Sequence, residues 1–379
     1  TKNMQTCSYL NRIRSSSNAP PRQAIFMSKR IYISPSWAFH DDRGEALNPQ
    51  LFTLLSRIKE TGKLTKAAAL ANISYRHGWN LLDQAHQFFG SQVVHLEKGR
   101  GATLSPLGEK LLWAEQRVAA RLTPQMENLA SELNIEIHKE IAELSPILRL
   151  HASHGYAVAL LPDYALGFQL DLQYKSPIDA LAALNRGACD LAGIHVPADL
   201  RIEPLIARYA EYLNTKDYRV IRFITRQQGL MVAPGNPHQV RGIQDLARPA
   251  LKFINRQPDS GTRALLDRLL TDALVDHTII TGYLEEEFTH TAVAAFVAAG
   301  MADIGFGVEA AARQFKLDFI PIAEEHYLMI CHRRTLRQAA CQQFLNQIRS
   351  PAFQASVASL PGYRSTRCGV IEALSESLL

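Results

Sequence analysis

Strand-like and helix-like segments alternate over residues 141–379, and this alternation constrains the fold more than any other feature of the chain. Apolar β-type runs such as ILRLHA and LKFINR precede segments with helical periodicity such as SPIDALAALNRG and SGTRALLDRLL. Because parallel strands are usually connected by helices, this order is typical of an α/β domain with mostly parallel sheets and helices on both faces. The length of the segment favours two lobes over one.

The composition excludes several classes of protein. Hydrophobic residues make up 47% of the 379 residues and charged residues 20%, which is typical of chains that fold around buried cores. These values exclude a wholly disordered chain, a collagen-like fibre and a small disulfide-rich protein. No apolar run in the sequence reaches the roughly 18 residues of a membrane helix. The five cysteines form no CxxC pair, so we expect reduced thiols in a cytoplasmic protein.

The positive charge is concentrated toward the N-terminus. Residues 1–26 hold four Lys and Arg and no acid, residues 27–140 hold 14 against 12 acids, and residues 141–379 hold 23 against 24. This asymmetry is typical of a nucleic-acid-binding segment attached to a nearly neutral ligand-binding body. We expect residues 1–27 to be a disordered arm or a non-native extension, with Met27 as a natural start. A transit peptide is the less favoured alternative.

The N-terminal third contains the pattern of three helices with a tight turn between the second and the third. Apolar residues recur every three or four positions from Leu51 to Ile58, and Gly62 then ends the first helix. The segment TKAAALA precedes Ser74, which is placed to cap a helix over residues 75–89. Two helices in this order are typical of a helix-turn-helix, whose second helix reads DNA bases from its first turn. A solvated two-helix hairpin is the alternative.

The next segment has the pattern of two short strands joined by a basic turn, followed by a long helix. Lys98 and Arg100 lie in the turn, where both cations can contact phosphates or the minor groove. Apolar residues then recur every three or four positions over residues 106–134. A helix of this length that leaves a small domain needs a partner, most simply the same helix of a second subunit.

Residues 30–140 resemble the winged helix-turn-helix of LysR-type regulators and, more closely, that of bacterial molybdate-responsive (ModE-like) regulators. The likeness is carried by the Ala pair before the turn, by SYRHGWNLL in the second helix and by GRGATLSPLG in the wing. It implies a DNA-binding domain over residues 28–105 and a linker or dimerisation helix over residues 106–140. The candidate DNA-binding residues are Lys66, Ser74, Tyr75, Arg76, Asn80, Lys98 and Arg100.

In the body of the chain, hydroxyl-bearing residues follow several predicted strands. These are Ser153, Ser176, Ser260 with Thr262, and Thr291. Ligands of open α/β sheets bind beyond the carboxyl ends of strands, where helix N-termini offer free N–H groups and partial positive charge. The repetition predicts an anion pocket, to which Arg263 can add a bidentate contact. Taken singly, each hydroxyl is better explained as a helix N-cap, and His195 as a core or hinge residue.

Residues 146–370 resemble the periplasmic-binding-protein-like domain described as molybdate-binding, which is often fused to a LysR-like winged helix. The likeness is carried by RLHASHG, CDLAGIHVP, NRQPDSGTR, THTAVAAFVAAGMADIGFG and SPAFQASVASLPGY. It implies an effector domain over residues 146–379 whose two lobes close on an oxyanion such as molybdate or tungstate; formate or another small carboxylate suits the same donors. The candidate ligand-binding residues are Ser153, His154, Ser176, Ser260, Gly261, Thr262, Arg263, His290 and Thr291.

Together these inferences predict a cytoplasmic, ligand-responsive transcriptional regulator that forms a homodimer or homotetramer and binds operator DNA and a small oxyanion. We expect no enzyme activity, metal, cofactor or membrane partner, because the sequence has no nucleophile–base pair and no ligand-spaced His/Cys cluster. Two alternatives stay open: a solute-binding protein for oxyanion uptake, and an enzyme on the same scaffold with His154 or His290 as the base. The anion, the operator, the sign of regulation and the oligomeric state also stay open.

Overall fold

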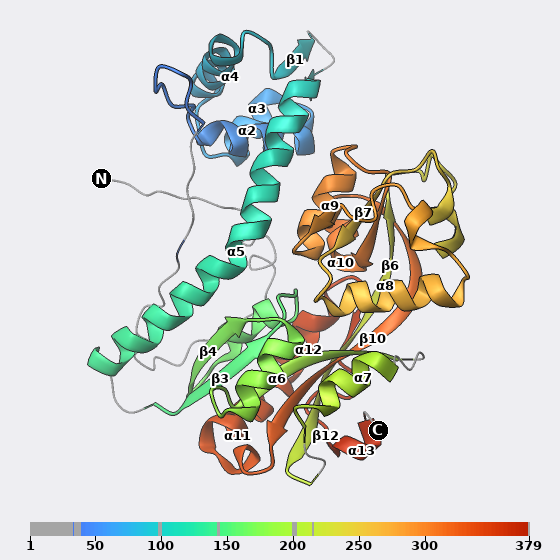
Figure 1. Cartoon of the computed structure of the whole chain (residues 1–379). Coiled ribbons are helices and arrows are strands. Elements are labelled where there is room, and N and C mark those ends of the chain that lie inside the picture. Colours follow the sequence, from blue (N-terminus) through green and yellow to red (C-terminus); the bar gives the residue numbers. More distant parts are fainter. Residues whose placement is uncertain are drawn as a thin grey trace. The chain divides into compact units, whose positions relative to one another are not determined.

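The computed structural model describes residue 33 and residues 39–97, 101–141, 145–198, 203–213 and 216–377. The chain separates into two compact units, whose boundary falls between Leu122 and Thr123 inside the long helix α5 (Pro106–Ile141). Figure 1 shows the elements of each unit. The expectations for residues 1–27, including the start at Met27, lie outside the described residues.

The described part of the N-terminal unit contains three helices and a two-stranded antiparallel sheet, followed by the first part of α5. The helices are α2 (Gln50–Thr61), α3 (Leu64–Leu70) and α4 (Tyr75–Phe89), and the strands are β1 (Val94–Glu97) and β2 (Gly101–Leu104). Apolar side chains from all five elements, including Leu54, Leu81 and Ala102, form one core. Lys98 and Arg100 of the predicted wing lie outside the described residues.

Local sequence signals set the helix ends in this unit. The hydroxyl of Ser74 accepts a backbone hydrogen bond in the first turn of α4 (3.1 Å), which confirms the predicted cap. Gly62 and Gly90 end α2 and α4 in the left-handed conformation (φ 63° and 65°), which glycine adopts without strain. Helix α5 continues past residue 134 to Ile141, because no Gly or Pro interrupts the segment between them.

The C-terminal unit is a mixed α/β structure, and its described strands form one ten-stranded sheet. The strands are β3 (Ile147–Ala152), β4 (Gln169–Tyr174), β5 (Leu191–Pro197), β6 (Tyr218–Val232), β7 (Phe253–Arg256), β8 (Glu286–Glu287), β9 (Ile304–Val308), β10 (Asp318–His332), β11 (Tyr363–Arg364) and β12 (Ile371–Ala373). The α-helices are α6 (Pro177–Asn185), α7 (Glu203–Ala210), α8 (Gly261–Asp272), α9 (His290–Ala298), α10 (Glu309–Gln314), α11 (Ala339–Ile348), α12 (Pro351–Ala358) and α13 (Leu374–Ser377). Short 3₁₀ segments are η1 (Val158–Tyr164), η2 (Ile243–Ala247), η3 (His277–Ile279) and η4 (Thr335–Arg337).

The sheet is mixed, whereas the sequence pattern predicts mostly parallel strands. Strand β3 pairs in parallel with β4 and β5, and β7 pairs in parallel with β8 and β9. Strand β10 is antiparallel to β5 and β6, and β6 is antiparallel to β9. These antiparallel pairs arise because β6 and β10 run in opposite directions between the two groups of parallel strands (Figure 1). The sequence pattern predicts a strand only over GLMVAPG, which contains the last four residues of β6, because charged residues interrupt the rest of β6.

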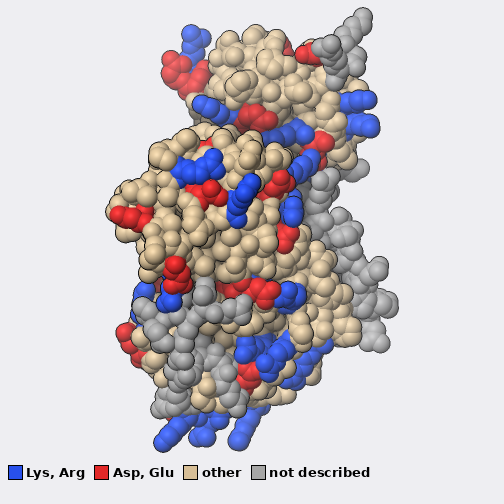
Figure 2. Space-filling model, turned by 90° about the vertical axis from the view of Figure 1, so that its right-hand side faces the viewer, with Lys and Arg blue, Asp and Glu red and all other residues tan. Residues whose placement is uncertain are grey.

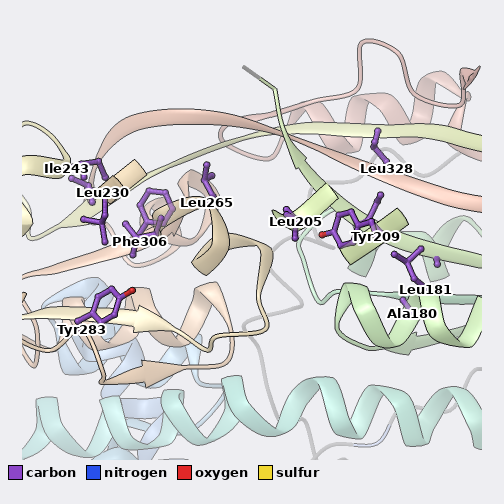
Figure 3. Packing of buried hydrophobic residues seen from close by; sticks show 14 of the residues in the cluster. Ala180, Leu181, Leu205, Tyr209, Leu230, Ile243, Leu265, Tyr283, Phe306 and Leu328 are labelled. Carbon is purple, nitrogen blue, oxygen red and sulfur yellow. The ribbon is translucent and has the colours of Figure 1, made fainter. Parts of the chain in front are cut away.

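The two groups of parallel strands are the centres of two lobes. The first lobe contains β3, β4 and β5 with α6 and α7, and the second contains β7, β8 and β9 with α8, α9 and α10. Figure 3 shows core side chains in two groups, with Leu230, Ile243, Leu265, Tyr283 and Phe306 in one and Ala180, Leu181, Leu205, Tyr209 and Leu328 in the other. Leu230 belongs to β6 and Leu328 to β10, so each of the two groups includes a residue from one of the long strands.

Two further features of the described residues concern membrane-spanning helices and the cysteines. None of the helices in the described ranges has both the length and the apolarity needed to cross a bilayer. Cys189, Cys331, Cys341 and Cys368 are buried free thiols, and Cys7 lies outside the described residues.

We predict that Gly229→Ala destabilises the C-terminal unit. A Cβ at Gly229 would lie 2.2 Å from the backbone oxygen of Ile320, where β6 and β10 approach closely. The strands must separate to accept it, so we expect the free energy of unfolding in urea to fall by about 1–3 kcal/mol. Gly155→Ala is the control, because its Cβ would make only an ordinary 3.6 Å contact. Equal stability of the two variants would contradict this account of the strand crossing.

Candidate functional site

An ion pair between Arg226 and Glu325 is buried where β6 and β10 run from one lobe to the other. The two residues are partners in the strand register, and their side chains are 3% and 1% exposed. Nε and Nη2 of Arg226 lie 2.7 and 2.6 Å from Oε2 of Glu325. Burial acts to raise the pKa of Glu325, but the charge of Arg226 and the hydrogen bonds from Gln228 and Arg226 act together against burial, and the pKa lies below its usual value. The pair is therefore ionised.

His195 and Tyr327 contact the ion pair. Nδ1 of His195, on β5, lies 3.3 Å from Nη2 of Arg226, and the His195 and Tyr327 rings meet edge to face with centroids 4.2 Å apart. Burial, and next the charge of Arg226, lower the pKa of His195 to about 3. The ring is therefore neutral at pH 7, and Nδ1 can accept a hydrogen bond from the guanidinium. The Tyr327 hydroxyl donates to the backbone oxygen of Ser153 (3.3 Å), which joins the end of β3 to the cluster.

Gln228 connects the ion pair to the second lobe. Its Nε2 donates to Oε2 of Glu325 (3.0 Å) and to Oγ1 of Thr262 in the first turn of α8 (3.1 Å). Because an ionised carboxylate can only accept hydrogen bonds, the amide atom that faces Glu325 must be the nitrogen. This fixes the orientation of the amide. The other amide atom, Oε1, is buried and has no hydrogen-bond partner among the described residues.

A second buried arginine lies at the end of β7. Nε of Arg256 donates to Oε1 of Gln257, and Nη2 donates to the backbone oxygen of Phe288, both at 3.0 Å. Burial, and next the charge of Arg226, lower the pKa of Arg256 to about 10. Asp259, Glu325 and Glu287 act in the opposite direction but do not restore the ordinary value. Arg256 therefore stays protonated at neutral pH.

Two further histidines, His290 and His154, are neutral because they are desolvated and lie near the charges of buried arginines. Burial, and then the charges of Arg256 and Arg226, lower the pKa of the buried His290 well below its usual value. His154, which follows β3, is partly exposed, and desolvation followed by the charge of Arg256 lowers its pKa to about 4. The cluster therefore combines two guanidinium charges and the carboxylate of Glu325 with three neutral imidazoles.

The helices α8 and α9 begin at this cluster. A Cβ on Gly261, the first residue of α8, would lie 3.1 Å from Cβ of His195, so the first turn of α8 lies close to this histidine. At the start of α9, Oγ1 of Thr291 lies 3.2 Å from the hydroxyl of Tyr156, which also donates to Oε1 of Gln314 on α10. Tyr156 follows β3, so these bonds connect the two lobes. Helix N-termini add partial positive charge to the cluster.

The structure places the predicted ligand-binding residues in two groups. It joins Ser153, His154, Gly261, Thr262, His290 and Thr291 to the cluster through the contacts and charges described above. Ser260 and Ser176 cap α8 and α6, accepting backbone hydrogen bonds at 3.1 and 3.2 Å. The guanidinium of Arg263 contacts Asp267 and Glu286 and lies over the ring of Tyr283 (4.1 Å). Nη1 of Arg263 also donates to the backbone oxygen of Arg256 (3.0 Å), so Arg263 is bonded to the end of β7 as well as to acidic side chains.

Sequence reasoning misses most of the central residues of the cluster. It does not select Arg226, Gln228, Arg256, Glu325 or Tyr327, and it interprets His195 as a core or hinge residue. The available signal is a charged residue inside an otherwise apolar strand, as in FIPIAEEHYLMICH and LKFINR. Such a signal identifies a buried charge but not its partner, because the pairing of β6 with β10 joins distant parts of the chain.

In the N-terminal unit, exposed aromatic and polar side chains surround the start of α4. Tyr75 and Trp79 are 50% and 44% exposed, with ring centroids 6.5 Å apart. The predicted DNA-binding residues Lys66, Ser74, Tyr75, Arg76 and Asn80 are all exposed. On the face in Figure 2, Lys and Arg lie among Asp and Glu. The Lys and Arg side chains on this face are exposed, whereas Arg226 and Arg256 of the C-terminal unit are buried.

Comparison with known proteins identifies part of the chain. Residues 161–349 match the family described as the PBP superfamily domain. An uncharacterised protein from the ferredoxin gene region of Clostridium pasteurianum is 33% identical over 108 residues, which cover 28% of this chain and 96% of that protein. The two chains therefore belong to one family.

Other relatives are matched over part of their length. The uncharacterised protein YvgK of Bacillus subtilis is 31% identical over 201 residues, 52% of this chain and 64% of YvgK. The molybdenum-pterin-binding protein MopB of Rhodobacter capsulatus is 27% identical over 118 residues, 30% of this chain and 43% of MopB. This chain thus spans less than two thirds of either protein. Among solved structures, a hydrogen-peroxide-bound mutant of Corynebacterium glutamicum OxyR is 17% identical with a TM-score of 0.43, covering 82% of this chain and 93% of OxyR.

We predict that the free energy of unfolding falls as the pH drops below about 6.5, the usual pKa of an unfolded histidine. The folded forms of His195 and His290 have lowered pKa values, so protons bind to the unfolded chain first. Stability from these groups is complete above about pH 6.5 and is lost toward the folded pKa, at about 1.4 kcal/mol per pH unit for each histidine. Urea unfolding at several pH values measures the slope.

The variant His195→Gln should give a shallower slope, because it removes one of these titrations. His277→Gln, at an exposed position on η3, is the control. An unchanged slope in His195→Gln would show that His195 takes no part in the pH dependence.

Proposed function

We propose that this chain, which contains a domain of the PBP superfamily over residues 161–349, is a ligand-responsive transcriptional regulator. In this proposal the C-terminal unit binds a small anion, and the N-terminal unit binds operator DNA. The observation that carries the proposal is the buried cationic cluster around Arg226 and Arg256. We further propose that this regulator is cytoplasmic, acts without a catalytic step and needs no membrane partner.

The anion assignment rests on the charge balance of the cluster. Glu325 neutralises Arg226, but among the described residues the guanidinium of Arg256 donates only to Gln257 and to the backbone of Phe288 and has no carboxylate within ion-pair distance. An anion bound near Arg256 would supply the missing charge. The starts of α8 and α9, with Thr262 and Thr291, add N–H and hydroxyl donors. Contacts from β6, β7 and both helices would let the anion favour one arrangement of the lobes over another.

The DNA assignment rests on the order of elements in the N-terminal unit. Helices α3 and α4, the strands β1 and β2 and the helix α5 follow one another as in a winged helix-turn-helix. Arg76 and Asn80, near the exposed start of α4, can bind guanine and adenine edges. We assign phosphate contacts to Lys66 and Ser74, and also to Lys98 and Arg100, which the sequence predicts in a wing and which lie outside the described residues.

Helix α5 provides a route from ligand to DNA and a contact between subunits. In its second half, Asn128 bonds both backbone groups of Tyr174, and Ser131 accepts from the backbone N–H of Leu172 (3.0 Å). These bonds hold α5 against the edge strand β4 of the first lobe. Apolar side chains on α5 are exposed, namely Val118, Leu129 and Leu133. We assign this stripe to the same helix of a second copy, giving a homodimer or homotetramer.

The effector is proposed as a small oxyanion, with molybdate, tungstate, formate and other small carboxylates as candidates. The partial match to MopB, which is named for molybdenum-pterin binding, favours the first two. The lowered pKa values of His154 and His290 speak against an enzyme that uses either as a base, because they make both rings weak bases at neutral pH. The N-terminal unit favours a regulator over a solute-binding protein for uptake.

We predict that Arg76→Ala weakens binding to a DNA duplex selected by the wild-type protein from random sequences. Loss of a base contact should reduce affinity by about 1–3 kcal/mol and relax the sequence preference. Fluorescence anisotropy at fixed salt measures the affinity. Arg268→Ala, which removes an exposed arginine of α8, is the control and should bind as the wild type does. Equal affinity of all three proteins would contradict the assignment of α4 to DNA.

We also predict that Arg256→Met abolishes stabilisation by anions. A ligand that binds the folded state at 100 times its Kd stabilises by about 2.7 kcal/mol, which raises Tm by several degrees. The probes are sodium phosphate, sulfate, molybdate, tungstate and formate at equal ionic strength. Arg248→Met removes a half-exposed arginine outside the cluster and should respond as the wild type does. Equal shifts in Arg256→Met and the wild type would exclude Arg256 from the site.

A further inference from the structure

The hydrogen-bonding state of Gln228 restricts what the site can bind. Its Nε2 already donates to Glu325 and Thr262. Rotation of the amide by 180° would bring Oε1 of Gln228 against the carboxylate oxygen of Glu325, which cannot donate a hydrogen bond. Its Oε1 is fully buried and has no partner among the described residues. A buried carbonyl oxygen without a donor is costly, and native proteins rarely leave one unpaired.

The side chain of Gln228 lies beside the residues of the proposed anion site. Gln228 and Arg226 are two residues apart on β6, so their side chains lie on the same face of the sheet. The amide nitrogen of Gln228 contacts the first turn of α8, which is one of the helix starts that surround the cluster. The site therefore contains a fixed hydrogen-bond acceptor beside its cationic donors.

We propose that the effector is a small anion that also carries an O–H donor, and that Gln228 selects it by accepting this hydrogen bond. The proposal rests on the anion site proposed above and narrows its ligand class. Hydrogenphosphate and α-hydroxycarboxylates belong to the class. The class does not include molybdate or tungstate, which the partial match to MopB favours, nor sulfate or formate, because at neutral pH the oxygens of all four anions only accept hydrogen bonds.

The physical basis of the selection is the unpaired oxygen itself. An O–H group on the ligand can donate a hydrogen bond to Oε1 of Gln228. An anion whose oxygens only accept leaves Oε1 without a donor and places one of its own oxygens next to Oε1. Sites built to bond a ligand hydroxyl discriminate strongly against analogues that lack it, since the buried polar group then stays unpaired. We therefore expect at least a tenfold preference for the donor-bearing member of a matched pair.

Isothermal titration of the full chain with matched anions tests the proposal. At mildly alkaline pH, hydrogenphosphate and sulfate are tetrahedral dianions that differ by one proton, and glycolate and acetate are monoanions that differ by one hydroxyl. We expect the donor-bearing anion of at least one pair to bind at least tenfold more tightly. Equal binding of both members of each pair would overturn the proposal, because a buried water would then supply the donor.

The variants Gln228→Met and Gln227→Met identify the residue responsible. Methionine has a similar length but no amide, so Gln228→Met should reduce the preference to less than threefold while charge-driven binding persists. Gln227 lies on the opposite face of β6, bonded to the backbone of Ala323, and its replacement should keep the preference. A full preference in Gln228→Met would also overturn the proposal. If no anion binds the wild type, the proposed anion site itself fails, which separates the two hypotheses.

Discussion

The ion pair between Arg226 and Glu325 is the interaction on which the organisation of the C-terminal unit depends. Burying two charges is costly, and the cost is offset only when the partners meet closely and their other bonding positions are filled. Here Arg226 contacts both Glu325 and His195, and Glu325 also accepts from Gln228. Because these residues come from β5, β6 and β10, the pair requires the three strands to meet in one register.

The same pair determines the chemistry of its surroundings. Since Glu325 compensates Arg226 but not the whole cluster, the field of the guanidiniums of Arg226 and Arg256 opposes protonation of the nearby histidines. Neutral imidazoles can donate and accept hydrogen bonds without adding charge. An anion would therefore meet the ion-paired Arg226, the protonated Arg256 and several polar groups, in a site whose histidines are neutral at pH 7. The net charge of such a site stays constant near neutral pH.

The features that the sequence could predict are those set by local interactions. The start and end of α4 follow from Ser74 and Gly90, and β3 and α8 follow from the periodicity of their own residues. The full length of β6 and the Arg226–Glu325 pair could not be predicted in this way, because they depend on pairing between distant segments. Hydroxyls at helix starts are ambiguous for a related reason. Ser176 is the N-cap of α6 and Thr262 lies in the first turn of α8, and only the tertiary neighbours of Thr262 reveal its contact with Gln228.

Strand β6 combines the properties that a sensing element needs. It runs through both lobes and carries the charge of Arg226 and the acceptor of Gln228 on one face. Arg226 is connected to the first lobe through His195, and Gln228 to the second lobe through Thr262. A ligand that engages both residues must therefore sense the relative position of the lobes, since a shift of either lobe would change one of these connections. Recognition of the ligand and its effect on lobe geometry would then depend on the same few hydrogen bonds, so an anion that satisfies only the charge would also be a weaker signal.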